Sequence, residues 1–110
     1  MLLFLKIYKM TQVKIGKVSD LKKGESKVIN VNGKVLALFN VDGKIFVIEN
    51  ACLHKGGPLG EGQLDGSIVT CPLHGWKYDV TSGRCTFPAT NLEVKSYEVH
   101  IKGEGIFIDT

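Results

Sequence analysis

Apolar residues alternate with polar ones along most of the chain, with the two-residue period of β-strands. Runs of this kind between turn signals predict strands around Val13, Ile15 and Val18, and at Lys27–Val31, Val35–Phe39, Ile45–Ile48, Ile68–Val69, Val94–Ile101 and Ile106–Ile108. Asn32-Gly33 and Asp42-Gly43 separate consecutive strands and favour type I′ hairpin turns. No segment keeps a helical period, and a single helical turn is expected only at Ser19–Lys23, capped by Ser19 or Asp20.

This pattern predicts an all-β fold, an antiparallel β sandwich or partly open barrel. A length of 110 residues suits one domain, residues 1–110. Residues 1–10 are expected to be a frayed extension or a short edge strand, because the regular pattern begins only after Met10. Two breaks in the strand pattern, Asn50–Gly62 and Cys71–Trp76, predict two projecting loops, where functional residues tend to gather.

Composition and charge exclude several classes of protein. Apolar residues make up 44% and charged residues 23%, as in an ordinary globular domain. The net charge of +3 is scattered and too small for a nucleic-acid-binding surface. The apolar run Met1–Leu5 is shorter than the roughly 20 residues of a membrane span and has no signal-peptide pattern. Three cysteines without a CxxC pair do not predict a disulfide framework, and we expect a reducing cytoplasm.

Each of the two loops carries one cysteine and one histidine. The pattern is C-x-H, then sixteen residues, then C-x-x-H, formed by Cys52, His54, Cys71 and His74. Thiolate and imidazole ligands together suit an iron–sulfur cluster, zinc or copper. A structural Cys2His2 zinc site is one alternative, although zinc ligands more often come as CxxC and HxxxH pairs. Nucleophilic Cys/His catalysis is another, and it would leave the pairing of the two loops unexplained.

The flanking residues carry a specific resemblance. C-x-H followed by Gly-Gly-Pro-Leu, and Cys-Pro-Leu-His-Gly-Trp in the second loop, resemble the Rieske family over roughly residues 13–108. The resemblance implies a β sandwich with an inserted cluster-binding subdomain, about residues 51–76, and one [2Fe–2S] cluster. It implies that Cys52 and Cys71 hold the inner iron, while His54 and His74 hold the outer iron near solvent.

The function that the resemblance implies is one-electron transfer. A monomer of this kind would take electrons from a flavin reductase and pass them to a terminal oxygenase or similar enzyme. It would bind no nucleic acid or membrane, and it would have no substrate and no turnover of its own. The alternative is the small subunit of a nitrite reductase complex, which belongs to the same family.

The sequence differs from the high-potential Rieske proteins of cytochrome bc complexes at several positions, and these differences indicate which branch of the family it resembles. Those proteins carry an extra cysteine in each loop, joined by a disulfide, at positions that are Gly57 and Leu73 here. They place a serine hydroxyl where Trp76 lies, whereas their tyrosine is retained as Tyr78. The chain therefore resembles the soluble Rieske ferredoxins, and its midpoint potential is expected near the low end of the family range, around −150 mV.

Other residues near the motif are given more modest roles. Cys85 is expected to be a semi-buried bystander, and His100 is expected to be a surface or half-buried residue that is not a ligand. Trp76 is expected to be a lid over the cluster, with a partner-docking aromatic as the alternative. Lys55 and Lys77 lie beside the ligands in sequence, where they could meet an acidic partner.

Overall fold

The computed structural model describes residues 11–110, so the extension expected at residues 1–10 lies outside the described part. The described chain is almost entirely β-structure with two single turns of 3-10 helix, η1 and η2. The elements are β1 Gln12–Lys17, η1 Val18–Asp20, β2 Ser26–Val31, β3 Lys34–Val41, β4 Lys44–Glu49, η2 Leu59–Glu61, β5 Gln63–Asp65, β6 Ile68–Thr70, β7 Lys77–Asp79, β8 Cys85–Phe87, β9 Ser96–Tyr97, β10 Val99–Lys102 and β11 Gly105–Asp109.

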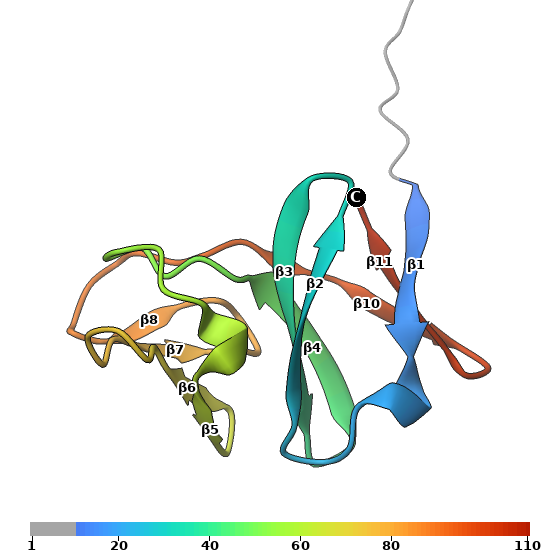
Figure 1. Ribbon diagram of the computed structural model, residues 1–110, viewed down its shortest axis with the longest axis horizontal. Helices are drawn as coiled ribbons and strands as arrows, with labels where there is room; N and C mark the ends of the chain where they lie inside the picture. Colours follow the sequence, from blue (N-terminus) through green and yellow to red (C-terminus); the bar gives the residue numbers. More distant parts are fainter. Residues whose placement is uncertain (1–10) are drawn as a thin grey trace, which may run out of the picture.

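The strands form three antiparallel sheets, which lie side by side in Figure 1. One outer sheet has the order β1-β11-β10, the central sheet β2-β3-β4-β9 and the other outer sheet β5-β6-β7-β8. The first two sheets make the sandwich, and the third is the small inserted unit that precedes β9 in the chain. The prediction of an all-β, antiparallel fold is therefore confirmed.

The central sheet is buried on both faces, because successive side chains of a strand point to opposite sides. In β3, Leu36 and Leu38 belong to the core shared with β10 and β11. Ala37 and Phe39 belong to a second core, which includes residues of the β5–β8 sheet and of the loops beside it. A continuous apolar run in β3 thus supplies two cores at once.

The two hairpin turns fix the register of the central sheet. Asn32 and Gly33 have φ values of 51° and 84°, and Asp42 and Gly43 have values of 52° and 96°. Positive φ at both central residues defines the type I′ turn, which matches the twist of the flanking strands. The hairpins predicted from these two dipeptides are confirmed.

Other local predictions needed correction. The helical turn expected at Ser19–Lys23 is a shorter 3-10 turn, Val18–Asp20, and the Asp20 carboxylate accepts a hydrogen bond from the Lys17 amide at 3.3 Å. Strands β5, β7 and β8 were not predicted. Each has only three residues, which is too short for a two-residue period to repeat.

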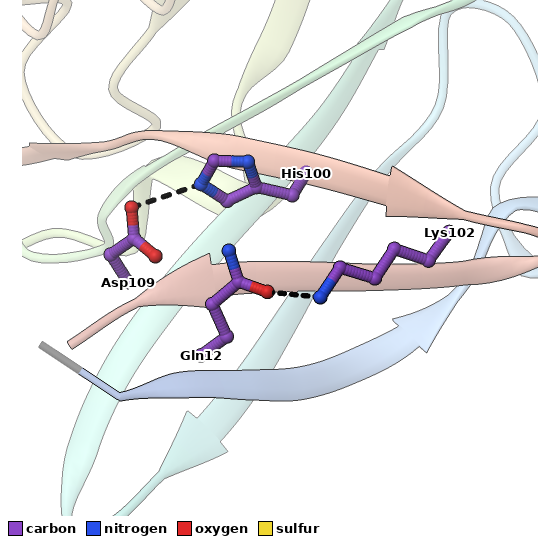
Figure 2. Close-up of polar contacts among 4 residues, drawn as sticks. All are labelled: Gln12, His100, Lys102 and Asp109. Atoms are coloured by element: carbon purple, nitrogen blue, oxygen red, sulfur yellow. Dashed lines mark hydrogen bonds and ion pairs between the residues drawn. The ribbon is translucent and has the colours of Figure 1, made fainter.

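Polar side chains tie the outer sheet of the sandwich together. Figure 2 shows His100 of β10 paired with Asp109 of β11, with 2.9 Å between Nε2 and Oδ2. Beside it, the Lys102 ammonium donates to the side-chain oxygen of Gln12 in β1. The His100 ring is therefore engaged in a contact with Asp109 within the sandwich. Among the described residues, no helix has the length and apolar character that crossing a membrane requires.

Gly62 gives a test of the packing that holds β5 against β6. A Cβ atom at this residue would lie 2.1 Å from the carbonyl oxygen of Thr70. We expect Gly62→Ala to destabilise the fold by about 1–3 kcal/mol, because the backbone must move apart to accept the methyl group. The measurement is the unfolding temperature by circular dichroism, with about 4–8 °C lost per kcal/mol for a chain of this size.

The matched control is Gly16→Ala in β1, where no atom lies within 4 Å of the added Cβ. We expect this variant to unfold at the wild-type temperature or slightly above it. Equal losses in the two variants would contradict the steric explanation.

Candidate metal centre

The two loops of the Cys/His motif have the same backbone hydrogen bonds. The Cys52 amide donates to the Gly57 carbonyl at 2.8 Å, and the Cys71 amide donates to the Trp76 carbonyl at 2.7 Å. In return, each cysteine carbonyl accepts from the glycine four residues later, Gly56 or Gly75. These glycines have φ values of 72° and 77°, a conformation that glycine adopts without strain. Both loops therefore have a glycine at this position because the turn that they share requires a positive φ there.

The four candidate ligands come together where the loops meet. Cys52 and Cys71 are each 3% exposed, and each thiol influences the pKa of the other. His54 and His74 are exposed, and their ring centroids lie 4.9 Å apart with the rings edge to face. The structure thus places two thiols inside and two imidazoles outside.

The surroundings of the thiols favour negatively charged sulfur at Cys52. Burial is the largest influence and raises the pKa of Cys52, but hydrogen bonds from Tyr78, Cys71 and two backbone amides outweigh it, so the pKa is lowered overall. Burial is also the main reason why the pKa of Cys71 is raised, and the neighbouring Cys52 adds to the shift. The backbone amides of Leu73 and His74 act in the opposite direction and lower the pKa of Cys71. Such convergent N–H groups form the kind of concavity that binds anions.

Tyr78 contacts the sulfur of Cys52 directly through its hydroxyl. Its hydroxyl oxygen accepts a hydrogen bond from the Leu53 amide at 2.9 Å and lies 3.3 Å from the Cys52 sulfur. A thiolate can only accept, so once Cys52 is ionised the Tyr78 hydroxyl is the donor of this bond. Burial and the neighbouring Cys52 raise the pKa of Tyr78 well above its usual range, so the hydroxyl keeps that proton at neutral pH.

The first loop is anchored to the central sheet by residues that the sequence analysis missed. Asn50 follows β4, and its side-chain oxygen accepts from the Gly60 amide at 2.8 Å while its backbone carbonyl accepts from Leu59. The Ser26 hydroxyl of β2 donates to the Gly60 carbonyl at 2.7 Å. Asn50 is only 9% exposed. The one feature of the sequence that could have indicated its role is that this polar residue directly follows an apolar strand.

The loops also contact each other directly. A Cβ atom at Gly57 would lie 2.6 Å from the Cys71 sulfur and 3.0 Å from the Leu73 side chain. The two positions identified with the disulfide of high-potential relatives therefore do lie against each other, with apolar packing between them. Trp76 crosses to the first loop and stacks on His54, with ring centroids 4.8 Å apart and an interplanar angle of 3°.

Cys85 and His100 lie outside the four-residue group. Cys85 is buried in the same core as the two loop cysteines, but its sulfur lies 3.5 Å from the Phe87 carbonyl and 3.7 Å from that of Pro88. Burial raises the pKa of its thiol. His100 is paired with Asp109 in the sandwich. Both placements agree with the minor roles expected for these residues.

Comparison with known proteins identifies this arrangement. The model of the Rieske [2Fe-2S] domain matches residues 11–98. The chain belongs to the Rieske family. Its donor set fits the cofactor of that family, since Rieske clusters are held by two cysteines and two histidines. The anion-binding loops also suit a group of sulfide and thiolate ligands.

Curated relatives of this Rieske chain are ferredoxin components of dioxygenase systems. The ferredoxin component of the naphthalene 1,2-dioxygenase system of Pseudomonas putida is 34% identical over 92 residues, covering 84% of this chain and 88% of that protein. The ferredoxin subunit of the 3-phenylpropionate/cinnamic acid dioxygenase of Shigella boydii is 38% identical over 94 residues, covering 84% and 87%.

Solved structures agree with this relationship. The ferredoxin of Sphingomonas yanoikuyae B1 superimposes with a TM-score of 0.84 at 32% identity, covering 91% of this chain and 99% of that one. A chain from the complex of reduced oxygenase and oxidized ferredoxin in carbazole 1,9a-dioxygenase gives a TM-score of 0.83 at 26% identity, covering 92% and 94%.

The hydroxyl of Tyr78 gives a quantitative test of the site. Tyr78→Phe keeps the ring but removes the proton directed at Cys52, a hydrogen bond that strengthens when the cluster gains negative charge. If that gain is about 1 kcal/mol, the midpoint potential should fall by on the order of 40 mV, measured by protein-film voltammetry.

Tyr97→Phe is the control for that substitution, because the Tyr97 hydroxyl contacts Glu49 at 3.2 Å in the sandwich core. Its midpoint should equal that of the wild type. An unchanged midpoint in Tyr78→Phe would show that the hydroxyl proton is not directed at the sulfur.

Proposed function

We propose that this protein is a one-electron carrier whose [2Fe–2S] cluster is held by Cys52 and Cys71 on the inner iron and by His54 and His74 on the outer iron. The observation that carries the proposal is the pair of matching loops, which present two buried thiols and two exposed imidazoles. The zinc alternative shares the donor types, but family membership favours iron and sulfide.

The ligand set explains why such a carrier accepts electrons readily. The bound cluster supplies a single reversible electron step. With two thiolates and two neutral imidazoles it is formally neutral when oxidised, whereas four thiolates would leave it doubly negative before any electron arrives. Tyr78 and the loop amides stabilise the extra negative charge on the sulfur side. His54 and His74 keep the other side open to solvent, where a partner can approach.

We propose that the electron donor is a flavin reductase and the acceptor is a terminal oxygenase. The ferredoxin components among the relatives support this, as does the oxygenase–ferredoxin complex among the structural neighbours. The surface around the imidazoles suits brief docking. Leu53 is 45% exposed and Leu73 is 53% exposed, and Lys55, which follows His54 in the chain, is also exposed. A small apolar centre with basic neighbours fits a partner with an acidic rim.

We also propose that the chain acts as a single Rieske domain and a monomer, with residues 51–76 as its cluster-binding loops, in the cytoplasm. The second core supports the domain assignment, because it joins these loops to the central sheet. Three cysteines without a disulfide among them support a reducing compartment.

Ligand substitution tests the cluster assignment. Cys52→Ser and Cys71→Ser should abolish the cluster, because a thiolate is lost from the inner iron. Cys85→Ser is the matched control, since it alters a buried cysteine in the same core and should keep wild-type content. The measurements are iron and acid-labile sulfide per chain, with the electron paramagnetic resonance spectrum of the reduced protein. A colourless wild type with stoichiometric zinc would refute the proposal, and loss of the cluster in Cys85→Ser would refute the ligand set.

The docking surface gives a second test. Lys55→Glu reverses a charge beside His54, so electron transfer to an acidic acceptor should slow several-fold at low ionic strength and approach the wild-type rate at high salt. Lys34→Glu is the control, because Lys34 is exposed and begins β3 at its hairpin turn from β2, opposite Val31 and outside both cluster loops. Figure 1 shows this hairpin turn at the far end of the central sheet from the strands β5 and β6. Stopped-flow reoxidation by a terminal oxygenase measures both. Equal slowing in the two variants would indicate an effect of net charge alone.

A further inference from the structure

Three aromatic rings from the two loops form a continuous group. The Trp76 indole is parallel to the His54 imidazole, with centroids 4.8 Å apart and 3° between the planes. His54 in turn meets His74 edge to face, with centroids 4.9 Å apart and 69° between the planes. Trp76 belongs to the end of the second loop and His54 to the first, so the stack crosses between loops.

Trp76 is the fixed member of this group. It is half-buried and packs against the core that contains Val69 and Tyr78. Its carbonyl accepts the 2.7 Å hydrogen bond that closes the second loop, and β7 begins at the next residue. The indole plane is therefore set by the core.

His54 lacks the contacts that usually fix a metal-bound imidazole. Histidine ligands are normally oriented by a hydrogen bond from the second ring nitrogen to a carboxylate or carbonyl. Within residues 11–110, His100 is the histidine whose ring makes such a bond. His54 is exposed on a loop, and its ring contacts two others, His74 edge to face and Trp76 face to face. His74 is itself exposed on a loop, whereas Trp76 packs against the core, so the Trp76 contact is the one that ties the His54 ring plane to a fixed part of the fold.

The stack has an electrostatic consequence of definite sign. Indole covers one face of the imidazole and keeps water from it, and water would stabilise the more negative, reduced state. The indole face is itself electron-rich, so it also disfavours added negative charge. Both effects lower the midpoint potential while the stack is intact.

We propose that Trp76 is a positioning residue for His54: its indole fixes the orientation of this imidazole and thereby lowers the midpoint potential of the cluster. The inference rests on the proposed function, because it takes His54 as a ligand of the outer iron. It assigns Trp76 a role in tuning the redox centre, beyond filling space beside it.

Three substitutions separate the effect of ring stacking from the effect of side-chain volume. Trp76→Phe keeps a flat aromatic face, whereas Trp76→Leu keeps apolar volume without one, and Trp76→Met is a second, more adaptable non-aromatic variant. Each purified holoprotein is measured for iron and sulfide content, for midpoint potential, and for the electron–nuclear double resonance of nitrogen-15-labelled histidine in the reduced state.

We expect every variant to contain the cluster and Trp76→Phe to match the wild type. Trp76→Leu and Trp76→Met should have a raised midpoint, and the nitrogen coupling of one histidine should be altered or broadened while that of the other is unchanged. Rescue by phenylalanine would show that the aromatic face is the cause.

Several results would overturn the inference. Unchanged couplings and midpoint in the non-aromatic variants would show that Trp76 only fills space. Slower transfer to the oxygenase with an unchanged midpoint would make Trp76 a docking residue. Equal shifts in all three variants, or failure of both non-aromatic variants to hold the cluster, would leave it a structural residue. A wild type without iron would instead refute the proposed function itself.

Discussion

The structure depends on a central sheet that is buried on both of its faces. Leu36 and Leu38 of β3 close the sandwich, while Ala37 and Phe39, which alternate with them, support the loops. Apolar burial is the main favourable contribution to folding, and it scales with the area removed from water. One strand therefore stabilises both the scaffold and the site, and a polar residue on either face of β3 would weaken one of the two cores.

The two loops share one pattern of backbone hydrogen bonds. In each, a cysteine amide bonds to the carbonyl five residues later, and a glycine four residues after the cysteine closes the turn. This geometry buries both sulfur atoms. Hydrogen bonds favour the charged form of Cys52 enough to lower its pKa, whereas at Cys71 burial and the neighbouring Cys52 raise the pKa. The imidazoles remain at the surface. An electron carrier needs both conditions, a preorganised environment for charge and an open edge for the partner.

The loops are joined by packing instead of a covalent bond. Leu73 and Trp76 of the second loop pack against the first loop, where Leu73 lies against Gly57 and Trp76 stacks on His54. Asn50 and Ser26 then fix the end of the first loop to the central sheet. Apolar contacts of this kind hold the two halves of the site in register while leaving the surface beside them free for docking.

The sequence by itself determined the local features and the chemistry. Asn32-Gly33 and Asp42-Gly43 specify hairpins because their backbone conformations are intrinsic to those residue types, and the Cys/His spacing with its glycines identified the family and four candidate ligands. Only the tertiary structure decided which face of β3 meets which core, how β7 and β8 pair, that Asn50 holds the first loop, and that Trp76 stacks on His54. The two cores and the ring stack are contacts between segments distant in the chain, and the β7–β8 pairing and the Asn50 bond depend on where those contacts place short local segments. No periodicity or short motif encodes them, because they arise only when the two cores bring those segments together.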